Sequence, residues 1–294
     1  MEALILRPDS SPLSRNIEDY PEGIIIPIDK PYRWTSADVI RKVKFAAIRH
    51  FGKKNLKVGH AGTLDPLATG VLLVCIGKAT KLAETLQSHD KEYVAGITFG
   101  ATTPSYDLEK EIDRFFPHEH ITADAVAEAL PEFIGEQDQI APLFSAKSVD
   151  GVRAYELARK LYRTMGRSDS DDAADIDAAA KDLLRVSRIN ISELELIEFC
   201  HDSHAAVETE NQGASSRINV TDNSALGLPR AVVRMACSKG TYVRAFARDL
   251  GEALGSGAHL DSLQRSRSGI FRVEDALTVE QAITALSDPN TIKH

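Results

Sequence analysis

The stretch Val58–Lys81, which reads VGHAGTLDPLATGVLLVCIGKATK, joins a polar loop to an apolar run and decides how the surrounding chain folds. The run VLLVCI is bounded by glycines, which is typical of a short buried strand. Gly62 and Gly70 flank Asp65, so the backbone near this acid can turn tightly or approach a ligand closely. Pro66 fixes its own φ and disfavours helical geometry at Asp65. The spacing therefore indicates either a turn, where aspartate is common, or a carboxylate presented for chemistry on a rigid loop.

The letters GHAGTLDPLATG, from Gly59 to Gly70, resemble the catalytic loop of the TruB-type pseudouridine synthases, which modify the TΨC arm of tRNA. The family pattern is G-H-x-G-x-L-D-P-x-A-x-G, and the sequence meets every fixed position. A match of this length is far more specific than a lone glycine motif. The resemblance implies that Asp65 is the catalytic residue. It also implies that His60 helps to extrude the RNA loop or fills the space that the flipped base leaves.

Two further blocks supply site residues by the same resemblance. The letters KEY, ending at Tyr93, are similar to the family's K-x-Y, so Tyr93 is expected to stack on the flipped base and to take part in proton removal. Periodicity alone favours a core tyrosine on a strand at this position. The letters CSKGTYVRAFARDLG resemble C-S-K-G-T-Y-I-R-x-L-x-x-D-L-G. By resemblance Arg244 pairs with the catalytic aspartate and Tyr242 lines the pocket; a structural ion pair is the alternative for the arginine.

The remaining blocks place Leu263 in the pocket and show where the sequence departs from the family. LQRSRSGIF, beginning at Leu263, resembles L-R-R-x-x-x-G-x-F, with Gln264 in place of an arginine. DKPYRWTS resembles D-K-P-x-G-x-T-S, with Arg33 in place of a glycine; if that glycine serves a turn with positive φ, arginine must strain or reshape it. ATTPSYDLE corresponds to the family's T-D-T-x-D, with Pro104 replacing its first aspartate. QIAPLFSAK resembles Q-x-P-P-x-Y-S-A-x-K, with Phe144 in place of tyrosine.

The composition is that of an ordinary globular protein of 294 residues, 43% hydrophobic and 27% charged. No apolar run approaches the about 18 residues that a bilayer crossing requires, and the first residues lack the pattern of a signal peptide. We therefore expect a cytoplasmic protein with no membrane contact. Cys75, Cys200 and Cys237 form no C-x-x-C pair, which argues against a zinc cluster. Cys75 and Cys237 lie in apolar stretches and are expected to be buried thiols.

Charge is distributed unevenly along the chain. The formal net charge of −8 argues against nucleic-acid binding when taken alone. Basic side chains nevertheless gather beside the Asp65 loop and near the C-terminus. A solvated helix face is the simpler interpretation of such a run, but the neighbouring loop favours contacts with RNA phosphates. The residues concerned are Lys30, Arg33, Arg41, Lys42, Lys44, Arg49, Lys53, Lys54, Lys57, Arg265, Arg267 and Arg272.

Hydrophobic periodicity predicts the secondary structure in outline. Strands are expected at 23–28 with a break at Pro27, at 71–76, at 91–100, and at 189–199 paired with 231–237. Helices are expected from Ser36, as N-cap, to about 49, up to 88, over 123–133 and 152–163, and from Thr241, as cap, to 254. Thr278 and Gln281 have the spacing of a capping box.

We expect one catalytic domain at 23–271, preceded by a loose polar extension at 1–22 and followed by a short helical tail at 272–294. Polar stretches near 167–182 and 202–229 indicate surface insertions. The resemblance implies the pseudouridine synthase fold, an α+β fold with a mixed, largely antiparallel sheet flanked by helices. Some family members carry a C-terminal PUA domain that binds tRNA, and the tail is too short for a full one.

The reaction implied by the resemblance isomerises uridine 55, in the TΨC loop of tRNA, to pseudouridine. It involves no redox change, so no cofactor and no metal are expected, and the target base must be flipped out of its folded loop. Asp65 acts either as a nucleophile or as the base that starts an elimination, and the residues do not choose between them. The expected partner is the TΨC stem-loop of tRNA. No obligate protein partner is expected, and the resemblance implies a monomer.

Two other functions stay open. One is an RNA chaperone that binds and folds tRNA without catalysis, which would not need the set of Asp65, Tyr93 and Arg244. The other is a guide-RNA-dependent pseudouridine synthase, whose catalytic loop is similar. Enzymes of that kind need a PUA domain and partner proteins, and the short C-terminal tail argues against this function.

Overall fold

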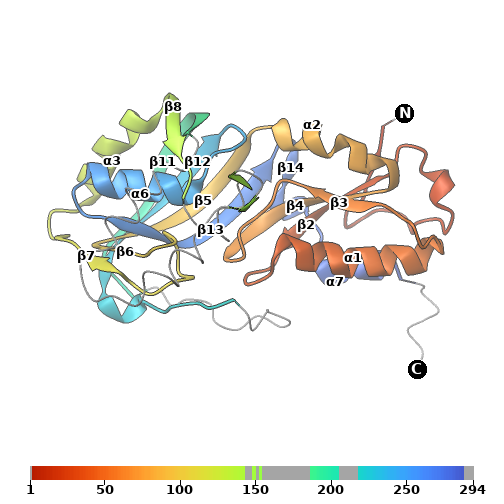
Figure 1. Cartoon of the computed structure of the whole chain (residues 1–294), viewed down its shortest axis with the longest axis horizontal. Coiled ribbons are helices and arrows are strands. Elements are labelled where there is room, and N and C mark those ends of the chain that lie inside the picture. The colour runs from red at the N-terminus through yellow and green to blue at the C-terminus, as the bar shows by residue number, and fades with distance from the viewer. Residues whose placement is uncertain (1, 143–147, 150–151, 154–185, 205–217, 288–294) are drawn as a thin grey trace. The chain divides into compact units, whose positions relative to one another are not determined.

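The computed structural model describes residues 2–142, 148–149, 152–153, 186–204 and 218–287. The chain divides into two compact units (Figure 1). Unit 1 comprises Met1–Val94, Glu208–Ile218 and Ser262–His294, and unit 2 comprises Ala95–Val207 and Asn219–Asp261. The boundary falls within two strands, β5 (Lys91–Phe99) and β13 (Ala258–Ser268), so each of them contributes residues to both units.

Unit 1 is built on the strand that follows the Asp65 loop. This strand, β4 (Ala68–Ile76), is almost entirely apolar and buried. It pairs antiparallel with β2 (Ile24–Lys30) along one edge; along the other it pairs antiparallel with β3 (Val58–Ala61) and parallel with β13. Two short strands complete this part of the sheet: β1 (Leu4–Ile5) runs parallel to β2, and β14 (Phe271–Arg272) forms a hairpin with β13.

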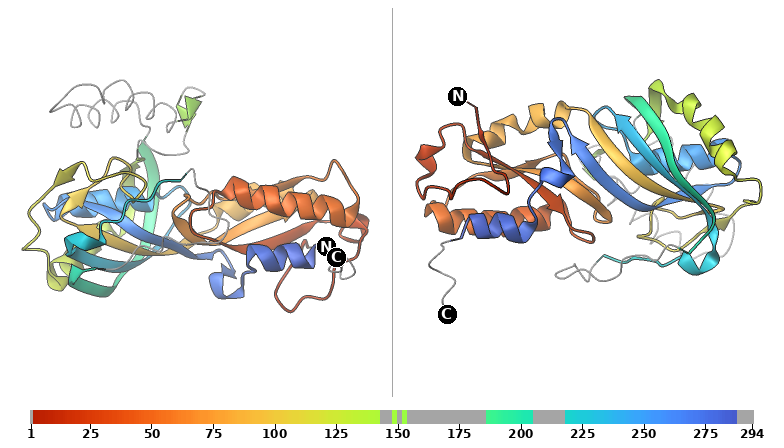
Figure 2. Two further views of the ribbon diagram at one scale, coloured as in Figure 1. Left: turned by 90° about the horizontal axis from the view of Figure 1, so that it is seen from below. Right: turned by 180° about the vertical axis from the view of Figure 1, so that it is seen from behind.

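Helices of unit 1 pack on these strands through apolar residues at helical spacing. α1 (Ser36–Phe51) buries Val39 and Val43 and begins with a capping box at Thr35. α7 (Val279–Ala285) lies beside α1 (Figures 1 and 2), and the predicted capping box of Thr278 and Gln281 starts it. The other elements are α2 (Ala83–Ser88) and the 3-10 turns η1 (Ile17–Asp19), η2 (Gly77–Leu82) and η5 (Val273–Asp275).

In unit 2 the strands are hydrogen bonded in the order β5, β12 (Leu228–Cys237), β11 (Val186–Ser203) and β8 (Gly135–Ile140). The β12–β11 and β11–β8 pairs are antiparallel. The helices are α3 (Ala123–Ala129) and α6 (Val243–Ala253). Two small hairpins are β6 (Ala101–Thr102) with β7 (Arg114–Phe115) and β9 (Ser148–Val149) with β10 (Val152–Arg153), and the 3-10 turns are η3 (Leu130–Phe133) and η4 (Ser224–Leu226).

The structure confirms the expected fold class, a mixed and largely antiparallel sheet with flanking helices. It also confirms the strands predicted at 71–76 and 91–100, the pairing of 189–199 with 231–237, and the helices ending near 88 and spanning 123–133. Cys75 and Cys237 are buried, as their apolar surroundings predicted. Burial raises the pKa of the Cys75 thiol to about 11.

Some predictions about local structure were wrong. The N-terminal segment is not loose, because β1 joins the sheet and Leu6 is 2% exposed. Pro27 does not break its strand. The Pro27 carbonyl accepts a hydrogen bond from Leu277 N–H at 2.9 Å. The N–H that proline lacks would point to the same side of the strand as this carbonyl, so the ladder of hydrogen bonds with β4 loses nothing and stays intact. Val152–Arg153 begin no helix but form β10, and residues 154–163 lie outside the described part of the chain.

The predicted insertion at 167–182 also lies outside the described residues, as does Phe144. Of the second predicted insertion, 202–229, the described residues include the end of β11, η4 and the start of β12. The division into one catalytic domain with an extension and a tail stays a prediction.

Candidate active site

The Asp65 loop (residues 62–67) joins β3 to β4 within unit 1. Gly62 and Gly70 have φ values of +84° and +96°, which confirms that these positions need glycine. Packing gives Gly70 a second reason, because a Cβ there would lie 2.3 Å from the carbonyl oxygen of Arg265. Asp65 is half-buried, and its carbonyl accepts a hydrogen bond at 3.1 Å from the N–H three residues later. The loop is therefore a closed turn anchored at both ends.

The segment Asp29–Ser36 lies against this loop. Ser36 is buried, and its hydroxyl both donates to the carbonyl of Leu64 at 3.2 Å and accepts from Leu64 N–H at 3.0 Å. Asp29 accepts from Gly70 N–H at 3.0 Å. Burial raises the pKa of the Asp29 carboxyl, and this hydrogen bond offsets part of the rise. The prediction that Ser36 is the N-cap of α1 was wrong, because Thr35 caps the helix and leaves the serine hydroxyl for the loop.

Arg33, the departure from the family glycine, has a φ of +59°, so of the two outcomes considered, strain or a reshaped turn, the chain shows the strained one. A non-glycine residue in this conformation costs roughly 1 kcal/mol. Its Nη2 donates to the carbonyl of Ile218 at 3.1 Å. Arg33 therefore adopts a strained backbone conformation, and its side chain makes a hydrogen bond that a glycine could not make.

Lys30 and Arg265, two members of the basic group, are 0% and 2% exposed. The expectation that they contact RNA phosphates was therefore wrong. A cation is buried in a protein only where protein acceptors replace water, and both of these face backbone carbonyls. The other members of the group are exposed or partly exposed, so a phosphate-contacting role stays a prediction for them.

His60 lies on β3 opposite Val74 and is partly buried. Burial lowers the pKa of its imidazole, and the Arg265 guanidinium lowers it further. Its Nδ1 is buried and has no hydrogen-bond partner among the described residues. The lowered pKa favours the neutral form of this imidazole, which suits filling space better than donating a proton as an acid.

Leu263 and Tyr93 belong to neighbouring strands of the sheet, β13 and β5. Leu263 is paired with Ala68, the first residue of β4, so it lies beside the end of the Asp65 loop. Tyr93 is 9% exposed, which fits its place on an alternating strand. The roles of both residues towards a flipped base stay predictions.

Arg244 lies in the first turn of α6, in unit 2, and is 5% exposed. Its Nε is 3.6 Å from Asp107 Oδ2, and its Nη1 donates to the carbonyl of Ser105 at 3.0 Å. Asp107 is in turn fixed: its Oδ1 accepts from the Ser105 hydroxyl at 2.6 Å and from Glu109 N–H at 2.9 Å. An ion pair between Arg244 and Asp65 stays a prediction. The structure adds Asp107, which orients the arginine.

The sequence motif contained Asp107, but no role was predicted for it. The signal was the partly kept T-x-S-x-D pattern, whose threonine also binds locally: Thr103 Oγ1 donates to the carbonyl of Asp107 at 2.7 Å. Gln139 is a second residue that was passed over. Its side chain accepts from the N–H of Tyr242 at 2.8 Å and donates to the Tyr242 carbonyl at 3.2 Å. Tyr242, not Thr241, is the N-cap of α6, so Gln139 fixes the start of the helix that carries Arg244.

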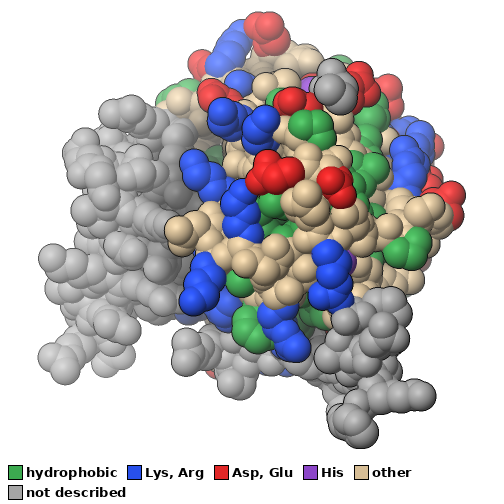
Figure 3. Space-filling view, turned by 90° about the vertical axis from the view of Figure 1, so that its right-hand side faces the viewer, with side chains coloured by type: hydrophobic (Ala, Val, Ile, Leu, Met, Phe, Trp, Pro, Cys, Tyr) green, Lys and Arg blue, Asp and Glu red, His purple; other side chains and the backbone are tan. Residues whose placement is uncertain are grey.

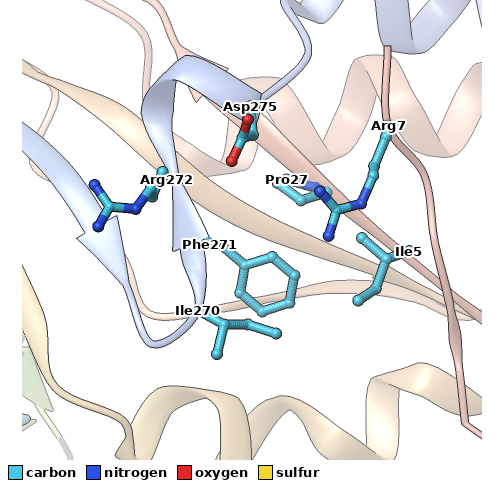
Figure 4. Close-up of a pocket in the computed structure, with 7 residues that line it drawn as sticks. All are labelled: Ile5, Arg7, Pro27, Ile270, Phe271, Arg272 and Asp275. Carbon is cyan, nitrogen blue, oxygen red and sulfur yellow. The ribbon is translucent and has the colours of Figure 1, made fainter. Parts of the chain in front are cut away.

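The structure brings His60, Asp65, Leu263 and Tyr93 into unit 1, while Tyr242 and Arg244 belong to unit 2. Within the described residues, no cluster of three or more His, Cys, Asp or Glu side chains could bind a metal ion. Among the described helices, none has both the length and the apolar character that crossing a membrane requires. A small pocket between β1, β2 and the β13–β14 hairpin contains none of the residues predicted for catalysis or for the pocket of the flipped base, although Arg272 of the basic group lines it (Figure 4). It is lined by Ile5, Arg7, Pro27, Ile270, Phe271, Arg272 and Asp275.

Comparison with known proteins gives the same family over most of the chain. Residues 49–170 match the TruB family pseudouridylate synthase N-terminal domain, and residues 244–289 match the tRNA pseudouridylate synthase B C-terminal domain. The tRNA pseudouridine synthase B of Phocaeicola vulgatus is 48% identical over 89% of this chain and 92% of its own length. The protein of the same name from Bacteroides thetaiotaomicron is 45% identical over the same shares.

Solved structures agree on the fold. A chain of the Cbf5–Nop10–Gar1 complex has a TM-score of 0.56 and 24% identity, covering 95% of this chain. This chain spans 58% of the length of that neighbour, and the likeness supports the fold alone. With relatives this similar over nearly their whole length, the chain belongs to the TruB family of pseudouridine synthases.

Proposed function

We propose that this protein converts uridine 55, in the TΨC loop of tRNA, to pseudouridine, with the Asp65 carboxylate as the catalytic group. The observation that carries the proposal is the Asp65 loop itself. A half-buried aspartate stands on a short turn between two glycines of positive φ, and buried side chains fix its backbone. A turn that only connected two strands would not need this support. The names of the relatives, tRNA pseudouridine synthase B, support tRNA as the substrate.

In the proposed reaction the glycosidic bond between N1 and C1′ breaks, the uracil rotates, and a new bond forms between C5 and C1′. C5 loses its proton and N1 gains one, so the product is an isomer and no electrons are exchanged. Asp65 either attacks C1′ or removes the C2′ proton to give a glycal. Tyr93 stacks on the flipped uracil and assists removal of the C5 proton. His60 occupies the space that the base vacates, and Leu263 and Tyr242 line the pocket.

Arg244 pairs with Asp65 in the proposed complex with RNA and keeps the carboxylate ionised, because a neighbouring cation favours the charged form. Its hydrogen bond to the Ser105 carbonyl and its ion pair with Asp107 support this role, since they restrict where the guanidinium can point. We further propose that the enzyme acts as a cytoplasmic monomer, without a guide RNA or a protein partner.

The test is tritium release from an unmodified tRNA transcript labelled at uridine C5, with purified protein and no added cofactor. Primer extension after carbodiimide treatment maps the modified position. Stoichiometric release with a single stop in the TΨC loop is expected. Asp65→Asn is expected to abolish product while tRNA affinity stays within about threefold.

Two results would contradict the proposal. Near-normal turnover by Asp65→Asn would remove the aspartate from its role. Tight tRNA binding by the wild-type protein without tritium release would favour the chaperone function, or the guide-dependent one if added guide RNA restored release.

A further inference from the structure

Five successive backbone carbonyls of the Asp65 loop, from Gly62 to Pro66, each accept a hydrogen bond. Buried carbonyls need a hydrogen-bond partner, and here most partners are side chains from other elements. Arg265 Nη2 donates to Gly62 O (3.0 Å), Arg265 Nη1 to Thr63 O (3.5 Å), Ser36 Oγ to Leu64 O (3.2 Å), Ala68 N–H to Asp65 O (3.1 Å) and Lys30 Nζ to Pro66 O (3.2 Å). Residues of β13, α1 and β2 therefore fix the loop on both sides of Asp65.

Arg265 donates two of these hydrogen bonds and a third to the strand after the loop. Besides the two loop carbonyls, its Nε donates to the carbonyl of Val71 on β4 at 2.7 Å. One guanidinium therefore ties the start of the loop to the strand that follows it. The planar guanidinium donates to these carbonyls from three separate nitrogens in fixed directions, whereas a lysine ammonium donates from a single nitrogen. Gly62 is needed for its φ of +84° and not for space, because a Cβ there would lie at an ordinary contact distance of 3.5 Å from Nη1.

The position of Arg265 excludes simpler roles. It is 2% exposed, so it cannot contact RNA in this conformation. Within the described part of the chain, its guanidinium donates only to backbone carbonyls. Burying a cation against neutral carbonyls costs desolvation energy, and a nonpolar side chain would fill the same space without that cost. The arrangement is explained if a fixed loop geometry is what the arginine supplies.

We propose that Arg265 is a positioning residue for the reaction: with Ser36 and Lys30, it holds the Asp65 loop rigid so that the carboxylate meets the ribose of the target uridine in one orientation. This inference rests on the proposed function. Reaction rates depend steeply on such alignment, and a displacement of about 1 Å can cost about 100-fold. The cost should therefore fall on the chemical step and not on RNA binding.

The experiment measures the single-turnover rate constant and the tRNA dissociation constant for Arg265→Lys, Arg265→Gln and Ser36→Ala. We expect the rate constant to fall by about 10- to 100-fold in the arginine variants and about 5-fold in Ser36→Ala, with dissociation constants within about twofold. Arg234→Gln removes an arginine paired with Glu195 on neighbouring strands, and Ser256→Ala removes a buried serine bonded to Gly100 N–H. Both controls should keep the wild-type rate constant.

A second readout does not depend on activity. Hydrogen exchange of the free protein should accelerate at Leu64 and Gly70 in Arg265→Lys and Ser36→Ala, and not in the controls. A weaker tRNA affinity with an unchanged rate constant would make Arg265 an RNA-binding residue and overturn the proposal, as would wild-type rate and exchange. If Arg265→Lys fails to fold, Ser36→Ala decides by the same criteria. If the wild-type protein makes no pseudouridine, the proposed function fails, and exchange alone still tests the support of the loop.

Discussion

Individual residues near Asp65 show how burial changes what a charged side chain does. Lys30 is completely buried and donates to the carbonyls of Pro31 (2.9 Å), Trp34 (2.6 Å) and Pro66 (3.2 Å). Burial lowers the pKa of its ammonium to about 7; the Asp65 carboxylate opposes this shift and the Arg265 guanidinium adds to it. Because an unfolded lysine has a pKa of about 10.4, this residue links protein stability to pH.

We predict that Lys30 makes the protein more stable as the pH rises above about 7. Between its folded and unfolded pKa values, the unfolded chain binds a proton that the folded chain has released. The free energy of unfolding should therefore rise by up to about 1.4 kcal/mol per pH unit, and below pH 7 the desolvation cost stays constant. The measurement is denaturant unfolding of wild type and Lys30→Met from about pH 6 to about pH 9. The difference between their free energies of unfolding isolates Lys30, because the contributions of the other titrating groups cancel. A constant difference would mean that the three carbonyls keep the lysine protonated throughout.

Elements place these residues, and α1 is the clearest example. Its capping box joins Thr35 Oγ1 to Asp38 N–H at 3.1 Å and Asp38 Oδ2 to Thr35 N–H at 3.0 Å. The next residue, Ser36, is the one bonded to Leu64. The start of the helix and the support of the Asp65 loop are therefore coupled through adjacent residues.

We predict that Thr35→Ala lowers the free energy of unfolding by about 1 kcal/mol, the usual cost of removing an N-cap. It should also slow the single-turnover reaction, because an unfixed helix start displaces Ser36. Thr122→Ala is the matched control, since Thr122 caps α3 by accepting from Ala125 N–H at 3.1 Å in unit 2. It should cost similar stability without slowing the reaction. Equal single-turnover rates for Thr35→Ala and Thr122→Ala would contradict the prediction, because the N-cap of α1 would then have no effect on the Asp65 loop.

Local sequence predicted much of this architecture and missed what depends on distant partners. The strand at 71–76 and the glycines beside Asp65 follow from rules that act over a few residues. The start of α1 was misplaced by one residue because Thr35 and Ser36 can both cap. Ser36 instead forms hydrogen bonds with Leu64, which lies 28 residues away in sequence, and this leaves Thr35 as the cap. The N-cap of α6 is Tyr242 and not Thr241 for a comparable reason, because the backbone of Tyr242 forms hydrogen bonds with the Gln139 side chain.

The burial of Lys30 and Arg265 was beyond sequence reasoning for the same physical cause. A charged residue is expected on the surface unless acceptors surround it. The acceptors of Arg265 all come from distant parts of the chain, and so does one of the three acceptors of Lys30, the Pro66 carbonyl. The basic group therefore contained two kinds of residue that composition cannot separate. Burial distinguishes the two that support the loop from those that stay available to RNA.

At the scale of the whole molecule, a protein with a net charge of −8 must bind a polyanion through local surfaces. One such surface is the end of unit 1 where α1 finishes and β3 begins, and Lys and Arg side chains gather on this face (Figure 3). Arg49, Lys53, Lys54 and Lys57 are exposed there, although Lys53 also pairs with Glu18 at 2.9 Å. The pairing of Val58 with Ile76 puts this end at the far end of β4 from the Asp65 loop. At about 3.3 Å per residue, the separation is about 25 Å.

We predict that this surface binds tRNA backbone outside the TΨC loop. Replacing Lys53, Lys54 and Lys57 together by Gln should weaken the binding of whole tRNA. The plot of log affinity against log salt concentration should also become less steep, by about 0.9 for each phosphate that the variant no longer neutralises. The affinity for an isolated TΨC stem-loop should change less. When its target base lies at the Asp65 loop, about 25 Å from these lysines, the fragment has fewer phosphates that can reach them than whole tRNA has. The single-turnover rate constant at saturating RNA should stay at the wild-type value, since none of the three lysines approaches the Asp65 loop. Equal affinities and equal salt slopes for wild type and variant on whole tRNA would leave these lysines as a solvated surface, and RNA would then have to bind through the other exposed basic residues.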